Sequence, residues 1–173
     1  TASHLIQNRA AYMDMVAQYA APVHFKLTGE MERLCVRYRS CVQTDRIQQH
    51  LTERLGTMLE REKEMRVSLV GPHREDFDLL VNDKNVREYG SQGQQRTAMI
   101  AVKIAIGKIA KKMTGEAPIL LLDDVLSELD SARANALFDH VKGMQIFLTT
   151  TDNIKLPLGQ HNYEVKNGLI RSI

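Results

Sequence analysis

Residues 116–133 read EAPILLLDDVLSELDSAR, and this stretch decides the fold. Its apolar run ILLL leads without a polar break into Asp123 and Asp124. A second unbroken run, IFLT at 146–149, follows after one helix-length segment. Continuous apolar runs are typical of strands covered on both faces, as in a parallel sheet with crossover helices. Because the carboxyl ends of parallel strands share one edge, we expect the two aspartates to lie beside Thr149–Thr151.

The apolar run that ends in two acids has two interpretations. Four apolar residues followed by an acid is the Walker B pattern of P-loop nucleotidases, in which a strand end fixes a carboxylate that binds Mg²⁺ beside the β- and γ-phosphates. The next acid, Asp124, would then orient or deprotonate the attacking water. In the alternative interpretation Asp124 caps the following turn and Asp123 makes a surface ion pair. The pattern alone leaves both interpretations open.

The remaining periodicities predict helices and strands around this unit. Apolar residues at helical spacing predict helices, and short runs bounded by Gly, Pro, Asn or Asp predict strands. The expected helices are residues 3–20, which Pro22 would end, a helix opened by Asp45, 92–113 and 131–142. The expected strands are 23–28, 34–42, 66–70, 77–81, 85–89, 119–122, 145–150, 163–166 and 169–172.

The composition is that of an ordinary globular protein. Of the 173 residues, 43% are hydrophobic and 25% are charged, which argues against disorder. The net charge of +2 does not by itself indicate a nucleic-acid partner. Two cysteines without a Cys-x-x-Cys pair argue against a disulfide framework or zinc site and fit a reduced, cytoplasmic setting. No apolar run reaches about 18 residues, so we expect no transmembrane helix and no membrane partner.

A second polar segment, YGSQGQQRT at 89–97, leads into an apolar helix. Small residues and Gly93 ahead of a helix leave backbone N–H groups free, where the helix dipole favours an anion. Ser91 can add a hydroxyl donor, so this helix start is a candidate phosphate contact. The alternative is a polar loop in which Ser91 is an ordinary N-cap.

Together, SQGQQRT at 91–97 and ILLLDDVLSELD at 119–130 resemble the signature, Walker B segment and D-loop of the SMC-like ABC ATPases, and most of all the RecF family. GPHREDF at 71–77 also resembles a stretch of that family. The resemblance implies an α/β fold: the C-terminal half of an ABC ATPase head, with a mostly parallel sheet and flanking helices, plus a helical lever-arm portion. It implies a lever-arm remnant with connecting strands at 1–65 and the C-terminal lobe of the head at 66–173.

The resemblance also implies a role for each matching residue. Asp123 would associate with Mg²⁺, and Asp124 would be the catalytic acid, where most ABC ATPases have a glutamate. Thr150 or Thr151 would lie at the switch position, where many ABC proteins have a histidine. The signature residues, which would contact the γ-phosphate of ATP held by a second subunit, are Ser91, Gln92, Gly93, Gln94, Gln95 and Arg96. The D-loop residues, which would cross the dimer interface, are Ser127, Glu128, Leu129 and Asp130.

The sequence has no Walker A phosphate-binding loop. The pattern GxxxxGK[ST] needs a hydroxyl residue after Gly-Lys, but Ile109 follows Gly107 and Lys108. In the RecF family this loop lies near the N-terminus, before the lever arm. The chain opens at Thr1 without a methionine, and we expect it to be a fragment. By itself it would bind ATP weakly or not at all, and it would be inactive as an ATPase.

The expected partners also follow from the resemblance. It implies an ATP-dependent homodimer that hydrolyses ATP and binds gapped DNA or single/double-strand junctions. RecO- and RecR-type mediators would help it load recombinase, in recombinational repair and the SOS response. Candidate DNA contacts are Arg37 and Arg39, which as an alternative are solvated residues at strand ends. His73 and Arg74 are candidates for contact with DNA or the nucleotide, or, as an alternative, for a structural role in their loop. Two other interpretations stay open: half of the head of a chromosome-organising SMC-like ATPase, and a non-enzymatic oligomerisation domain with a decayed site.

Overall fold

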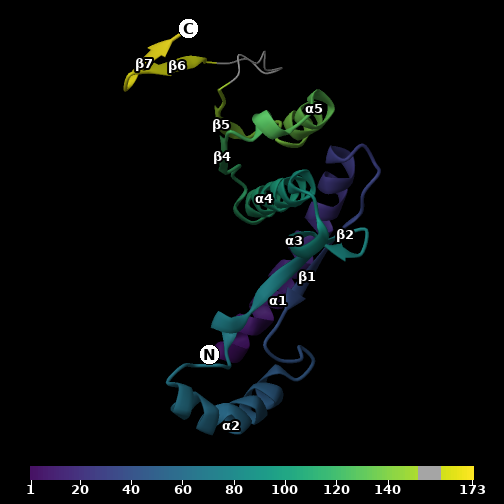
Figure 1. The fold of residues 1–173 in the computed structure, drawn as a ribbon, viewed down its shortest axis with the longest axis vertical. Helices are drawn as coiled ribbons and strands as arrows, with labels where there is room; N and C mark the ends of the chain where they lie inside the picture. The colour runs from purple at the N-terminus through teal and green to yellow at the C-terminus, as the bar shows by residue number, and fades with distance from the viewer. Residues whose placement is uncertain (152–160) are drawn as a thin grey trace.

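The computed structural model describes residues 1–151 and 161–173 and shows an arm below a head (Figure 1). The helices are α1 (Ala2–Leu27), α2 (Ile47–Met65), α3 (Val86–Tyr89), α4 (Gln92–Thr114) and α5 (Ser131–His140), with 3₁₀ turns η1 (Pro72–Arg74) and η2 (Leu126–Glu128). The strands are β1 (Leu34–Arg39), β2 (Asp76–Val81), β3 (Lys84–Asn85), β4 (Ile119–Asp123), β5 (Gln145–Thr149), β6 (Tyr163–Lys166) and β7 (Leu169–Ser172). None of the described helices combines the length and the apolar character needed to cross a membrane.

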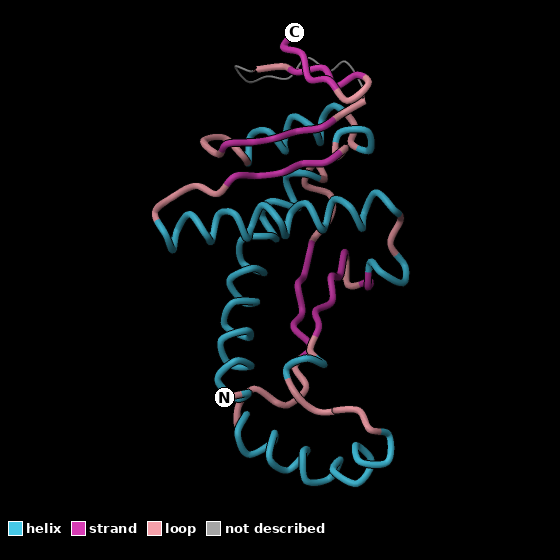
Figure 2. Tube along the Cα trace, turned by 90° about the vertical axis from the view of Figure 1, so that its left-hand side faces the viewer, coloured by secondary structure: helices cyan, strands magenta, loops and turns pink. Residues whose placement is uncertain are grey.

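The arm consists of α1, α2 and the antiparallel sheet β1-β2-β3, which lies alongside α1 (Figure 2). β1 and β2 pair along their whole length, ending at Arg39↔Asp76. At the far end of the arm, α2 closes a small separate core of Ile6, Val42, Leu51 and Val70. The predicted boundary between residues 65 and 66 falls between two strands of one sheet, and the division of the chain there remains a prediction.

The head consists of α4, α5 and the parallel pair that the sequence predicts. β4 and β5 pair from Ile119↔Gln145 to Asp123↔Thr149, and α5 is the connection between them. Figure 2 shows α4 crossing below the two strands. One face of the pair packs on the main core, in which α1, α4 and α5 also take part. Its most buried side chains include Val23, Leu27, Ile104, Ile109, Leu137 and Val141. Burying a side chain of this size contributes about 1.5–3 kcal/mol.

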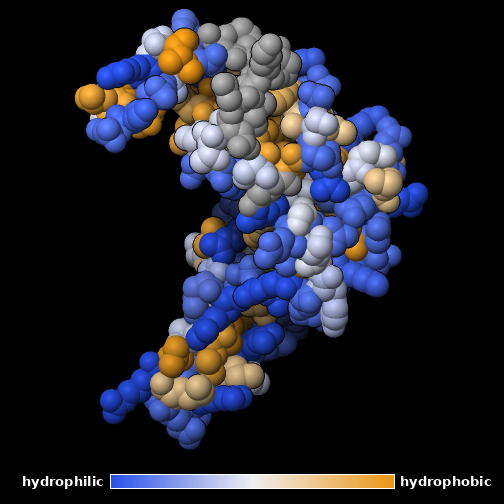
Figure 3. Space-filling view, turned by 45° about the horizontal axis from the view of Figure 1, so that its top comes forward, coloured by the Kyte–Doolittle hydropathy of each residue, from blue (hydrophilic) through white to orange (hydrophobic). Residues whose placement is uncertain are grey.

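The opposite face of β4 and β5 is apolar and exposed. Ile119, Leu121 and Phe147 are 58%, 70% and 57% exposed. The predicted C-terminal hairpin of β6 and β7 is confirmed, and Figure 3 shows apolar side chains at its surface. Within the described part of the chain, the two-sided burial that the continuous apolar runs predict is therefore met on one face only.

The first helix runs seven residues past the predicted end at residue 20, and the strand predicted at 23–28 is wrong. α1 continues through Pro22 to Leu27. Proline inside a helix removes one hydrogen bond and costs roughly 3 kcal/mol. Ala20, Val23 and Leu27 recur at helical spacing, and each is at most 1% exposed in the main core. Burial of this face outweighs the local preference of the proline.

Two further predicted strands are wrong for local reasons. Residues 66–70 form a loop, because Glu62 Oε1 accepts the backbone N–H groups of Leu69 and Val70 at 2.5 and 3.0 Å. Residues 85–89 form only the end of β3 and the short helix α3. Asn85 accepts the Arg87 N–H at 2.9 Å and caps that helix. In both places a side chain captures backbone donors that a strand would have paired.

Candidate functional site

Asp123 and Asp124 lie at the carboxyl end of β4, beside the end of β5. The Thr149 hydroxyl donates to Asp123 Oδ1 at 2.5 Å. The Asp124 N–H donates to the Thr149 carbonyl oxygen at 3.2 Å and to its hydroxyl oxygen at 3.0 Å. Asp124 has a φ of 47°, so the chain leaves the sheet in a left-handed turn. Thr149 holds the two acids at the strand end, and both Asp123 and Asp124 are exposed to solvent.

The threonine that makes these contacts is one position before the predicted switch residues. The sequence correctly predicts that the ends of β4 and β5 meet. It singles out Thr150 and Thr151, which follow β5 and are exposed. The register of the strands places Thr149 opposite Asp123, and register is not readable from either apolar run alone.

The predicted D-loop forms a short turn between the acids and α5. Ser127 Oγ donates to the Asp124 carbonyl oxygen at 2.9 Å. Asp130 accepts the Arg133 N–H at 2.8 Å and so caps α5. Leu126 is buried and anchors the turn in the main core. Ser127 and Asp130 are therefore held in place at the surface, directly after the acids.

The signature helix α4 begins with a reciprocal cap at Ser91. Ser91 Oγ accepts the Gln94 N–H at 3.2 Å, and Gln94 Oε1 accepts the Ser91 N–H at 3.0 Å. The N–H groups of Gln92 and Gly93 have no carbonyl within the helix to donate to, because they belong to its first turn. The Ser91 hydroxyl keeps its own proton for another acceptor. The N-cap predicted as the alternative is present, and it still leaves three donors for an anion.

The remaining signature residues lie along the first turns of α4. Gln95 Nε2 donates to the Gly90 carbonyl oxygen at 3.1 Å, which tightens the entry to the helix. A Cβ atom on Gly93 would lie 3.8 Å from Arg133 Nη1. The Arg133 side chain, from the first turn of α5, therefore reaches the start of α4.

A cavity of about 370 Å³ lies between α4 and β4. Arg96 and Lys103 of α4 line it, as do the two acids at the end of β4. Ser91 and Gly93 are not among the described residues that line it. The chain therefore brings Arg96 together with the acids, while the capped start of α4 lies outside this cavity.

The donors at the end of β4 fit Mg²⁺ that is bound together with phosphates. Among the residues that the structure describes, no group of three or more His, Cys, Asp and Glu side chains could hold a metal ion. Mg²⁺ is usually held by one or two carboxylates, with phosphate oxygens and waters completing its octahedron. One oxygen of Asp123 accepts the Thr149 hydroxyl and the other is available as a ligand. This donor set suits a metal that arrives with a nucleotide.

Two of the predicted DNA contacts lie on β1, opposite acids of β2. Arg39 Nη2 is 3.1 Å from Asp76 Oδ2, and its Nε is 3.4 Å from Asp78 Oδ1. Arg37 is exposed and lies opposite Asp78 in the strand register. Cross-strand partners thus neutralise part of the basic face, and Arg37 is the more available of its two arginines.

The other two predicted DNA contacts brace the loop after α2. Arg74 donates to the Ser68 carbonyl oxygen from Nε and Nη2, at 2.9 and 2.7 Å. His73 Nε2 lies 3.2 Å from the same oxygen. These contacts support a structural role for both side chains in the GPHREDF segment.

Glu75, in the same segment, is a buried carboxylate that the sequence does not reveal. It accepts hydrogen bonds from Arg9 Nη1 (3.2 Å), the Tyr38 hydroxyl (2.5 Å), Ser40 Oγ (3.2 Å) and the Cys41 N–H (3.3 Å). Burial opposes ionisation, but the bonds from Tyr38 and Cys41 hold the pKa of Glu75 below its usual range. Burial and Glu75 together raise the pKa of Tyr38. The hydrogen-bond partners of Glu75 are 34 to 66 positions away in the sequence, so no local sequence pattern indicates them.

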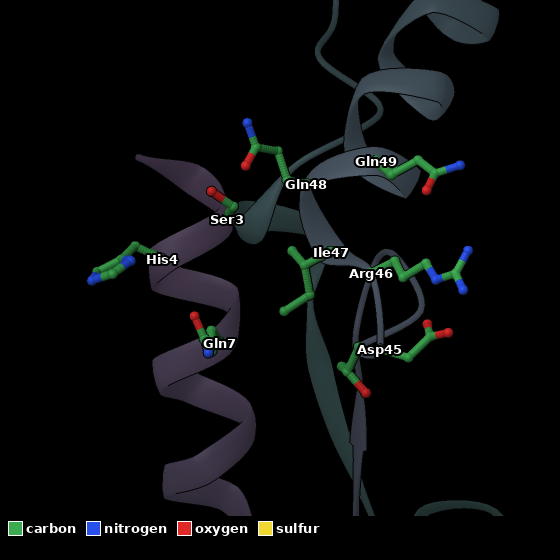
Figure 4. Close-up of a pocket in the computed structure, with 9 residues that line it drawn as sticks. Ser3, His4, Gln7, Asp45, Arg46, Ile47, Gln48 and Gln49 are labelled. Carbon is green, nitrogen blue, oxygen red and sulfur yellow. The ribbon is translucent and has the colours of Figure 1, made fainter.

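A second cavity, of about 460 Å³, lies at the far end of the arm between the starts of α1 and α2. Figure 4 shows mainly polar side chains around it, among them Ser3, Gln7 and Gln48. None of the predicted site residues lines it. It is therefore separate from the acids and from the signature turn.

Comparison with known proteins gives one consistent result. No family model matches the chain. The DNA replication and repair protein RecF of Geobacillus kaustophilus is 41% identical over 180 aligned positions, covering 98% of this chain and 48% of the relative. RecF of Lysinibacillus sphaericus is 41% identical over 157 positions, covering 87% of this chain and 42% of the relative. The chain thus spans about half the length of these relatives.

Solved structures agree with the sequence comparison. A structure of the recombination mediator protein RecF with ATP in the RecFOR pathway matches with a TM-score of 0.81 at 30% identity. A structure of that mediator with ATPrS matches with a TM-score of 0.79 at the same identity. Each match covers 99% of this chain and 47% of the solved chain.

Proposed function

We propose that this chain, which is RecF-like in sequence and in fold, supplies the signature turn and the magnesium-binding acid of a dimerising DNA-repair ATPase. One observation carries the proposal: the cavity beside the acids at the end of β4 is lined by Arg96 of α4 but not by Ser91 or Gly93 at the capped start of that helix. The absence of Ser91 and Gly93 from this cavity supports a site in which the acids of one copy act with the signature turn of another. The phosphate-binding loop, which this sequence lacks, comes from the rest of the protein.

At the first surface, Asp123 holds Mg²⁺ and Asp124 orients the attacking water. Mg²⁺ neutralises charge on the β- and γ-phosphates when ATP is bound. Thr149 supports both acids, because its hydroxyl bonds to the carboxylate of one and the backbone of the other. Asp124 is one methylene shorter than the glutamate common in ABC ATPases, so its reach depends on the left-handed turn that carries it.

At the second surface, the start of α4 contacts the γ-phosphate of ATP held by the partner copy. The Ser91 hydroxyl and the N–H groups of Gln92 and Gly93 are the donors, and the helix dipole favours the phosphate charge. Two copies related by a twofold axis then enclose two nucleotides. The D-loop residues from Ser127 to Asp130 cross between the copies, and Thr150 and Thr151 lie beside the γ-phosphate.

DNA is the substrate that we propose for the assembled dimer. The similarity to DNA replication and repair proteins named RecF supports this assignment. A solved RecF in the RecFOR pathway supports RecO- and RecR-type partners. We further propose that the dimer helps to load recombinase at gaps in the cytoplasm, in recombinational repair and the SOS response. Arg37 is our first candidate for a phosphate contact, since Arg39, His73 and Arg74 make contacts within the chain.

The test uses the full-length protein with Asp124→Asn, and Asp139→Asn as the matched control. Asp139 is an exposed aspartate of α5 that pairs with Lys142. Asp124→Asn should still dimerise with Mg-ATP in sedimentation, while its turnover falls about 100-fold or more, as expected for loss of a general base. The control should behave as wild type. Normal hydrolysis by Asp124→Asn would show that Asp124 is not the water-orienting acid.

A further inference from the structure

The arm meets the head at a buried polar cluster that the proposed function leaves unused. His24 of α1 is 0% exposed, and neither ring nitrogen has a hydrogen-bond partner in residues 1–151 and 161–173. Its Nε2 is 4.0 Å from Oε2 of Glu32. That oxygen is also buried and without a hydrogen-bond partner in the same residues. Buried polar atoms are normally paired, so three unpaired atoms in one place need an explanation.

The other oxygen of Glu32 connects this cluster to the signature turn. Glu32 Oε1 accepts a hydrogen bond from Gln94 Nε2 at 2.8 Å, across 62 positions of sequence. A carboxylate can only accept, so Glu32 selects the NH₂ end of the Gln94 amide. The amide oxygen then points to Ser91 and accepts its N–H. Gln94 thus bridges Glu32 at the end of the arm and the Ser91 cap of α4.

Glu32 is itself held by the turn that ends α1. The Thr28 hydroxyl, which is buried, donates to the His24 carbonyl oxygen at 3.0 Å and accepts the Glu32 N–H at 3.3 Å. Gly29 and Glu30 follow with φ of 63° and 66°, which reverses the chain towards β1. The position of Glu32 is therefore set by the end of α1.

The electrostatic environment keeps His24 neutral, so the interaction that remains for the Glu32 carboxylate is its hydrogen bond with Gln94. Burial lowers the pKa of His24, against the raising effect of Glu32, and Arg133 lowers it further. His24 is thus neutral near pH 7 and does not form an ion pair with Glu32. The Glu32–Gln94 contact is a hydrogen bond to a charged acceptor in a mostly buried place, and such bonds are about twice as strong as neutral ones.

We propose that Glu32 is a positioning residue that sets the Gln94 amide, and through it the Ser91 donor of the signature turn. This inference rests on the proposed function, in which Ser91 meets a γ-phosphate of the partner copy. Because Glu32 is fixed to the end of α1, the arm and the signature turn move together. A shift of the arm would change the orientation of the Ser91 hydroxyl donor relative to the γ-phosphate.

The first test needs no nucleotide. Hydrogen exchange in the full-length protein should show the amides of Ser91 and Gln94 exchanging about tenfold faster in Glu32→Ala, the effect of losing one charged hydrogen bond. Glu32→Gln keeps an acceptor but no longer selects the amide end, so its exchange should be intermediate. Glu30→Ala is the control, since among the described residues the Glu30 side chain pairs only with exposed Lys26 on the same turn. Unchanged exchange in Glu32→Ala would overturn the proposal.

The second test exchanges the two side chains. Gln94→Glu keeps an acceptor for the Ser91 N–H but places two carboxylates together, so the ATP concentration for half-maximal dimerisation should rise about tenfold. Adding Glu32→Gln restores a donor–acceptor pair and should recover most of that loss. If wild type dimerises with ATP and the double variant recovers nothing, the inference fails alone. If wild type shows no ATP-dependent dimer, the proposed function fails, while the exchange test still decides the role of Glu32.

Discussion

Two glutamates at opposite ends of the arm are buried in opposite ways. Glu75, at the far end, is 1% exposed and accepts bonds from four residues of α1, β1 and the segment after β1. Glu32, at the head, is 19% exposed and leaves one buried oxygen without a hydrogen-bond partner among the described residues. The first carboxylate is satisfied from every side. The second, beside the signature turn, has one carboxylate oxygen that accepts no hydrogen bond from the described residues.

The difference in hydrogen bonding suggests different roles: Glu75 stabilises the fold, and Glu32 serves the signature turn. A fully satisfied buried network fixes one structure, because every alternative breaks several bonds at once. A buried network in which some polar atoms lack partners can rearrange at a lower cost in free energy, because fewer hydrogen bonds must break. On this basis Glu75 fastens β1 and the loop before β2 to α1, whereas Glu32 adjusts the start of α4. The predictions below test this contrast, beginning with the largest effect.

Removing Glu75 should have the largest effect on stability. Glu75→Ala leaves the Tyr38 hydroxyl and the Cys41 N–H without their acceptor, which costs roughly 3 kcal/mol. Thermal and urea unfolding of the full-length protein measure the loss. Glu64→Ala, at an exposed position of α2, should stay within about 0.5 kcal/mol of wild type. Equal stability of the two variants would remove the contrast between the glutamates.

Removing one donor from the same network should cost about half as much. Tyr38→Phe keeps the ring in place and deletes the hydroxyl that bonds to Glu75 at 2.5 Å. The remaining three donors still hold the carboxylate, so we expect a loss of roughly 1.5 kcal/mol. The Glu75→Ala Tyr38→Phe double variant should be no less stable than Glu75→Ala alone. Additive losses would show that the two groups act independently.

The pH dependence of stability should distinguish the two ends. His24 has a lowered pKa in the folded protein. Below about pH 6.5 the unfolded chain therefore binds more protons than the folded one, and the free energy of unfolding decreases as the pH is lowered. Glu75 also has a lowered pKa, but its contribution is lost only below about pH 4.5. His24→Leu should flatten the upper part of this profile and leave the lower part intact. A profile unchanged by this variant would mean that His24 is not the buried neutral group.

Glu32→Ala should have the smallest effect on stability. It removes one hydrogen bond and relieves a buried oxygen that lacks a hydrogen-bond partner among the described residues, so the net change should stay below about 1 kcal/mol. The same unfolding measurements give this value. A loss as large as that of Glu75→Ala would make Glu32 a structural residue like Glu75.

Local patterns in the sequence were enough for the elements around the acids. The apolar runs before Asp123 and Thr149 predict two parallel strands that end together, and the register confirms it. The polar segment before α4 predicts a capped helix start at Ser91, and the cap is present. These features depend on neighbours in sequence, within one strand or one turn.

Contacts between distant segments decided what the sequence could not show. Pro22 predicts a helix end, but core packing of Val23 and Leu27 carries α1 beyond it. Arg39 and Arg74 read as candidate DNA contacts, because their partners come from β2 and from a loop that looks like a strand. The side-chain donors of Glu75 are 35 to 66 positions away, and the donor to Glu32 from the signature turn is 62 positions away, so no local pattern indicates either contact.

The central claim is that the acids of one copy act with the signature turn of another, and mixing two inactive variants tests it most directly. Full-length Ser91→Arg has an intact acid pair and a blocked turn, whereas Asp124→Asn has the reverse. Each alone should hydrolyse ATP slowly. Mixed in equal amounts, half of the dimers would contain one intact site, so activity should return to roughly a quarter of wild type. Hydrolysis that stays at the level of the separate variants, while wild type is active, would contradict a site divided between two copies.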